Sequence, residues 1–225
     1  MTVEINVPEN LSEITLNQFQ KYYKLVQENE PSEFVNQKTI EIFCDIKLSE
    51  VAKISYKSYN EILTHLTNIF NVNHKLVPTF EINGLEFGFE PNLEEMASGV
   101  YIDAEEYLKD ISTLNKAMAA LYRPIKSKKG NLYTIEPYEG SGIWADVMKF
   151  APLNVALGMQ VFFWNLGIEL SNATIQSLQE KKMELSEAEK KRLEESGVGI
   201  NQFMQQLEEV RLNLMKLQNF QLINF

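Results

Sequence analysis

The sequence is poor in the residues that most often carry chemistry. Cysteine occurs once, at Cys44, which excludes an intramolecular disulfide and a CxxC metal site. Histidine occurs twice, at His65 and His74, without an HExxH motif or a paired histidine. The N-terminus lacks the basic and apolar segments of a signal peptide. We therefore expect a protein made in a reducing, cytosolic compartment that is not an enzyme and holds no metal or cofactor.

Positive charge is scarce, since 21 Lys and Arg stand against 31 Asp and Glu, for a net charge of -10. A balance this acidic speaks against a general nucleic-acid binder, which normally carries a basic face. Four of the cations, however, lie in one short turn: Arg123, Lys126, Lys128 and Lys129. This basic tip is either a solvated loop or the contact for an acidic or phosphate-bearing partner.

Charge is absent altogether from Phe150 to Ile168. The length approaches the roughly 20 residues that a bilayer span needs. Pro152, Asn154 and Gln160 within the run and the lack of a flanking basic cluster argue against a membrane segment. We predict a helix buried in the core, with burial in an oligomer as the alternative.

The first third of the chain has helical periodicity. Thr15 and Gln18 have the spacing of a capping box, and a second apolar helix is expected over 34–46. Ser58 with Glu61 predicts the start of another helix. Asp103 with Glu106 predicts the start of a long helix that runs to Leu121.

Two hairpins are expected between these helices, at about 79–89 and 122–136. Asn83-Gly84 favours a two-residue turn in the first hairpin, which places Glu81 directly opposite Glu86. Like charges in that position are unfavourable, so a cation should neutralise them, and the basic tip is a candidate. The second hairpin is expected to close through 127–131, with Gly130 in the turn.

The last element is a predicted heptad helix over about 200–217. It packs either on the 152–170 helix or on another subunit. The final residues are strongly apolar and are expected to dock on a neighbour, through Phe220, Leu222, Ile223 and Phe225. The predicted fold is α+β and predominantly helical, in a single domain with possible subdivisions at 1–75, 76–170 and 171–225.

Several segments between about 80 and 170 resemble virion and tail-morphogenesis proteins of tailed bacteriophages, including the crAss-like group. Gly88-Phe89 with Pro91 and Leu93 resembles one such segment, and Tyr101 with Asp103 resembles a helix start. The others are Ala117-Met118 with Leu121 to Ile125, and Ile135 to Tyr138.

This resemblance implies a non-enzymatic structural protein of the virion or tail apparatus, assembled in the host cytoplasm. A tail-assembly chaperone that leaves before maturation is the second expectation, and an enzyme or small-molecule binder is the alternative from another class. The expected partners are other phage structural proteins or further copies of the chain. The expected contact residues are the basic tip, the carboxylates it can meet at Glu81 and Glu86, and the apolar tail.

Overall fold

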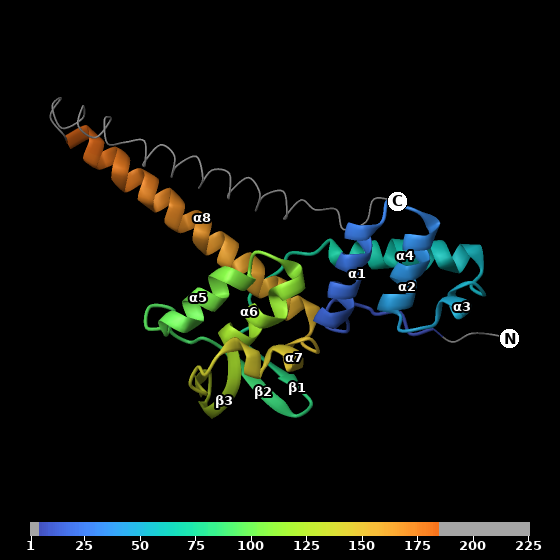
Figure 1. The fold of residues 1–225 in the computed structure, drawn as a ribbon, viewed down its shortest axis with the longest axis horizontal. Helices are drawn as coiled ribbons and strands as arrows, with labels where there is room; N and C mark the ends of the chain where they lie inside the picture. Colours follow the sequence, from blue (N-terminus) through green and yellow to red (C-terminus); the bar gives the residue numbers. More distant parts are fainter. Residues whose placement is uncertain (1–4, 185–225) are drawn as a thin grey trace. The chain divides into compact units, whose positions relative to one another are not determined.

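The computed structural model describes residues 5–184 (Figure 1). These residues form helices and, between the helices along the chain, two pairs of strands. In chain order they are α1 (Leu16–Glu28), α2 (Glu33–Phe43), α3 (Leu48–Val51), α4 (Tyr56–Phe70), β1 (Thr79–Ile82), β2 (Leu85–Phe89), α5 (Ser98–Tyr107), a 3-10 turn (Ile111–Thr113), α6 (Leu114–Leu121), β3 (Tyr122–Lys129), β4 (Leu132–Ile135), a second 3-10 turn (Ser141–Ile143), α7 (Ala145–Met148) and α8 (Leu153–Glu184). The predicted α+β, mainly helical fold is confirmed.

The described chain divides into two compact units inside α8, between Gln160 and Val161. The unit that ends at Gln160 holds the sheet and the helices before α8, together with the first turns of α8 itself. The second unit continues α8 from Val161. The single-domain organisation with subdivisions near residues 75 and 170 stays a prediction.

The N-terminal helices are held at their starts by side-chain caps. Thr15 and Gln18 form the predicted capping box at α1, where each side chain bonds the other residue's backbone N–H. At α4 the cap is Ser55, whose hydroxyl accepts from the backbone N–H of Ser58 at 3.1 Å. The prediction that Ser58 itself caps this helix is wrong by one turn. The second helix ends at Phe43, three residues before the predicted end.

Aromatic rings join α1, α2 and α4. Phe19 stacks on Phe70 at 5.9 Å between ring centroids, and Tyr22 lies 5.2 Å from Phe43. Phe43 and Phe70 complete the group at 5.3 Å. Such ring pairs add about 0.5–1.5 kcal/mol each beyond the burial of their area. The three helices therefore share one buried apolar seam.

The first hairpin forms in the predicted register. Asn83 and Gly84 adopt φ of 51° and 82°, the left-handed pair that a two-residue turn requires. Phe80 pairs with Phe87, and Glu81 lies opposite Glu86 as expected. The turn is favoured here because glycine and asparagine reach positive φ at low cost.

The second hairpin is longer and tighter than predicted. Its strands run to Lys129 and restart at Leu132, so the turn is only Gly130-Asn131, not 127–131. β3 also pairs with β2, with Phe89 opposite Tyr122. The two hairpins thus make one antiparallel sheet of order β1-β2-β3-β4.

The long helix predicted from Asp103 to Leu121 is interrupted. α5 starts before it, at Ser98, and ends at Tyr107, and α6 starts at Leu114. The break lies at Asp110, whose carboxylate accepts from the Ser112 backbone N–H at 2.8 Å and caps the 3-10 turn. An aspartate that bonds its own backbone two residues on competes with continued helix. The expected helix start at Asp103 is therefore wrong.

α6 is the central helix of the first unit. All its residues except the exposed Lys116 are buried: Leu114, Asn115, Ala117, Met118, Ala119, Ala120 and Leu121. A helix that is apolar on nearly all sides belongs inside a protein core. Its one buried polar member, Asn115, donates to the Ala145 carbonyl at 2.9 Å, so burial leaves its amide N–H satisfied.

The charge-free segment forms a helix, as predicted, with α8 starting one residue after Pro152. Backbone bonds tie its start to the N-terminal chain: Leu153 donates to the Ile14 carbonyl and Leu16 to the Ala151 carbonyl, at 2.8 and 2.9 Å. The first turns of α8 are buried, but residues 161–167 are half-buried or exposed, so the prediction that the whole segment is buried in the core is wrong beyond Gln160. Within the described residues, no helix has the length and apolar character to span a bilayer. The heptad helix, the segment after 184 and the apolar tail lie outside the described residues.

Candidate interaction surface

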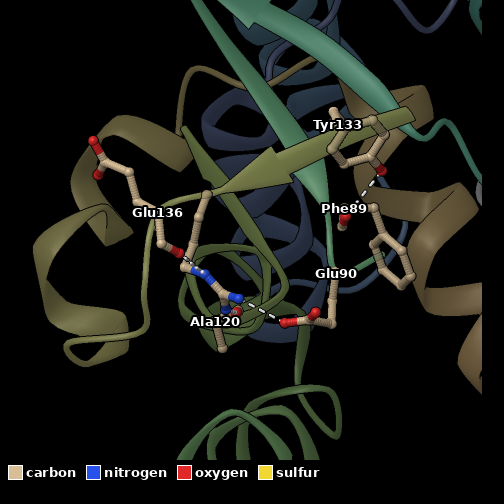
Figure 2. A network of polar contacts seen from close by, with 6 residues as sticks. Phe89, Glu90, Ala120, Tyr133 and Glu136 are labelled. Carbon is tan, nitrogen blue, oxygen red and sulfur yellow. Dashed lines mark hydrogen bonds and ion pairs between the residues drawn. The ribbon is translucent and has the colours of Figure 1, made fainter. Parts of the chain in front are cut away.

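Arg123 does not belong to the exposed basic tip, and its predicted placement there is wrong. It is 6% exposed and lies in β3, two residues after the end of α6. Its three nitrogen positions are all used: Nε donates to the Glu136 carbonyl and Nη1 to the Ala120 carbonyl, both at 2.8 Å, while Nη2 meets Glu90 Oε2 at 2.6 Å. Figure 2 shows these acceptors converging on the guanidinium.

This arrangement joins three parts of the fold. Glu90 follows β2, Ala120 lies in the last turn of α6 and Glu136 follows β4. The Ala120 carbonyl is one of the four at the end of α6 that lack a helical partner, so the arginine completes the helix end. Both partners of the ion pair are about nine-tenths buried, at 8% and 10% side-chain exposure. Arg123 therefore fixes the sheet on the helices rather than meeting a partner.

Tyr133 closes the same corner of the sheet. Its hydroxyl donates to the Phe89 carbonyl at 2.9 Å, as Figure 2 shows. Its ring lies over Gly88, where an added Cβ would sit 2.5 Å from a ring carbon. The glycine of the Gly88-Phe89 pair is thus required by close packing, which is a structural reason for its presence.

A second polar cluster holds the chain after β4 on α5. The Tyr138 hydroxyl donates to the Asp103 carboxylate. Burial raises the pKa of Tyr138 to about 12, and the Asp103 bond acts in the same direction. Burial alone would raise the pKa of Asp103, but the hydrogen bonds from Ser141 and Tyr138 together bring it below its ordinary value. Asp103 is therefore an anchor for the Ser141–Ile143 turn rather than a helix cap.

The remaining lysines do form an exposed tip. Lys128 reaches across to the Glu86 carboxylate within the same chain. The cation that the opposed Glu81 and Glu86 require is therefore supplied by the second hairpin. Lys126 and Lys129 are exposed and, among the described residues, have no ion-pair partner. We name the segment 126–132 the finger; it also presents Leu132, which is 79% exposed. Partner binding at the finger, at Glu81 and at Glu86 stays a prediction.

An outward face of α5 was not predicted from the sequence. Tyr101 and Ile102 are 56% and 61% exposed, and Glu105 and Glu106, one helical turn later, are exposed as well. These four side chains occupy one stripe, because residues four apart in a helix are neighbours on its surface. The opposite side of α5 buries Val100 and Ala104. The sequence signal was obscured because apolar residues lie on both sides of this short helix.

The histidines lie together at a pocket of about 540 Å³ between the 9–12 segment, α4 and the 72–77 segment. His65 Nε2 lies 2.9 Å from the Pro8 carbonyl, and burial lowers the pKa of His74. In the part of the chain that the structure describes, no group of three His, Cys, Asp or Glu residues is placed to hold a metal ion. Cys44 is buried in the apolar cluster with Ile40 and Leu63, and burial raises its pKa to about 11.

Comparison of the chain with protein-family models, curated proteins and solved structures finds no match.

Proposed function

We propose that this chain is a non-catalytic protein that acts through protein–protein contacts. The observation that carries the proposal is the division of its polar side chains into two groups. Arg123, Glu90, Asp103 and Tyr138 bond one another or the backbone inside the fold. The finger lysines and the α5 face point outward, next to large exposed apolar side chains.

Exposed apolar groups beside charges of one sign are the composition of a contact surface rather than of a reaction centre. Leu132 at the finger and Tyr101 with Ile102 on α5 each leave apolar area in water that a partner would cover. Charges around such groups set partner choice and the rate of encounter more than the affinity. This supports a role in which shape and charge select a neighbour.

The resemblance to phage virion and tail-morphogenesis proteins gives the proposal its particular form. A permanent component of the virion or tail apparatus is our first proposal. A tail-assembly chaperone, which binds its partners and then leaves, is the second.

Quantitative mass spectrometry of purified phage particles, set against the lysate of infected cells, tests both forms. A virion component remains in the particles at a fixed ratio to the major tail and capsid proteins. A chaperone is enriched in the lysate, in complexes with tail proteins, and is depleted from the particles. Recovery of the chain only as a free monomer, in the particle-free fraction and without phage proteins, contradicts the proposal.

A further inference from the structure

We propose that the finger of one copy binds the outward face of α5 on a second copy, so that the chains associate head to tail. This inference rests on the proposed function, because it names a second copy of the chain as one partner among those that the exposed surfaces can take. In this contact the finger of one copy and the outward α5 face of the next copy bind each other.

The two surfaces are complementary in charge. The finger offers two exposed cations, Lys126 and Lys129, since Lys128 is already paired with Glu86. The α5 face offers two carboxylates, Glu105 and Glu106, for which the described residues supply no ion-pair partner. In a chain of net charge -10, the finger is an exception that an acidic copy of the same chain would attract.

Each surface also carries exposed apolar side chains beside its charges. Leu132 follows directly after the finger turn and is the most exposed large apolar side chain of the described residues. On α5, Tyr101 and Ile102 lie one turn before the two glutamates. A leucine placed between these two side chains removes apolar area of both copies from water, at roughly 25 cal/mol per Å². The charges then fix the direction of docking.

The turn end of the finger, with Lys129 and Leu132, lies away from α5 of its own chain. The Phe89–Tyr122 pair marks the end of the sheet where β2 leads toward α5 and α6 leads into β3. The finger turn lies at the other end, about 23 Å along β3 at roughly 3.3 Å per residue. Figure 1 shows α5 beside α6, above the strands in this view. The contact is therefore between copies.

Such a contact is heterologous, because the two surfaces differ. A bound pair still presents one free α5 face, on the copy whose finger is used, and one free finger, on the other copy. Repetition therefore gives a ring if the rotation closes and an open filament if it does not. A subunit of this kind suits a structure that is built from many copies.

Paired charge reversals test the proposal on the full chain by sedimentation velocity at low salt. The finger variant Lys126→Glu with Lys129→Glu and the helix variant Glu105→Lys with Glu106→Lys each place like charges across the contact. Each alone should weaken self-association at least about tenfold, since both pairs become repulsive. An equimolar mixture should regain assemblies that alternate the two variants, because each finger then meets an oppositely charged α5 face.

Two controls carry the same change of net charge elsewhere. Lys21→Glu with Lys53→Glu matches the finger variant, and Glu9→Lys with Glu30→Lys matches the helix variant; all four positions are exposed. Both controls should associate as the wild type does. A monomeric wild type at high concentration, self-association that neither reversal changes, or a mixture that fails to recover would each overturn the inference. Those outcomes leave binding of other phage proteins intact, which the particle measurement tests separately.

Discussion

At the scale of single residues, the sheet depends on one buried cation. Arg123 combines an ion pair with two carbonyl acceptors, and each of the three comes from a different part of the fold. A buried charge without a counter-ion destabilises the folded chain. Removing one member of the ion pair therefore measures how much the folded chain depends on that pair. The sequence shows four cations close together and does not show which of them is buried. The burial of Arg123 becomes visible only in the folded structure.

Removal of the Glu90 carboxylate should destabilise the chain strongly. The substitution Glu90→Leu leaves the Arg123 charge buried without its anion, and such losses cost about 3–5 kcal/mol of unfolding free energy. Urea unfolding followed by circular dichroism measures the change. Glu61→Leu is the control: it loses an exposed pair with Lys57, at 3.8 Å, and should cost less than about 1 kcal/mol. Equal losses in the two variants would show that the Arg123 site does not hold the sheet.

The Tyr138–Asp103 bond predicts a stability change in alkali. The folded chain holds the pKa of Tyr138 at about 12, above the ordinary value of 10.0, because burial and the Asp103 bond favour the neutral phenol. Between pH 10 and 12 the unfolded chain loses this proton first, so the free energy of unfolding falls as pH rises. The contribution is fully present below pH 10.

The variant Tyr138→Phe isolates that contribution. Its free energy of unfolding should decline less steeply than that of the wild type from pH 10 to 12, since one titrating phenol is gone. Other buried tyrosines, among them Tyr22, still titrate in both proteins and cancel in the comparison. Parallel curves for the two proteins over this range would rule out the proposed role of the bond.

At the scale of secondary-structure elements, the start of α8 is fixed by close backbone approach. A Cβ added at Gly158 would lie under 3.0 Å from the Lys75 carbonyl oxygen, which belongs to backbone and cannot rotate away. The 72–77 segment therefore crosses α8 at a point where only glycine fits. A Cβ added at Gly167, two and a half turns later, would meet no neighbouring segment within 4 Å.

These two glycines give a matched pair of substitutions. Gly158→Ala should destabilise the chain by about 1–3 kcal/mol, because the methyl group forces the segments apart. Gly167→Ala should be neutral or stabilise by up to about 1 kcal/mol, because alanine favours the helix. Thermal unfolding of both variants measures the difference. Stabilisation of both, or of Gly158→Ala alone, would contradict the packing described for this crossing.

Local signals in the sequence were sufficient where one short motif determines the structure. The Thr15 capping box and the Asn83-Gly84 turn each act through bonds or dihedral angles within four residues, and both were predicted correctly. The break between α5 and α6 was missed because apolar periodicity continues across it. It arises from Asp110, whose bond to the Ser112 N–H replaces the helical pattern.

The burial of Arg123 and the α5 face could not be predicted for a different reason. The burial of Arg123 depends on the pairing of β2 with β3, which brings together residues more than 30 positions apart. The sequence patterns predicted each hairpin by itself and did not indicate that the two hairpins share one sheet. Exposure of Tyr101 and Ile102 likewise follows from which side of α5 meets α6, and the sequence offers apolar residues on both sides.

At the scale of the whole molecule, we propose that the chain presents a cationic finger and an acidic, apolar helix face to other proteins, including further copies of itself. Salt should weaken the contact, since charges that stay near water are screened over about 10 Å at 0.1 M ionic strength. The burial of apolar area around Leu132 is not weakened by salt in this way. The charged and the apolar contributions to the affinity can therefore be separated by varying the ionic strength.

Carbodiimide cross-linking of mixed light and heavy-nitrogen chains tests this claim most directly, because it joins lysines to carboxylates that touch. We expect mixed-isotope peptides that link Lys126 or Lys129 to Glu105 or Glu106, and their yield should fall as the salt concentration is raised. The Lys128–Glu86 link within single chains serves as the positive control. If that control link forms while no mixed-isotope link joins the finger to α5, the claim is contradicted.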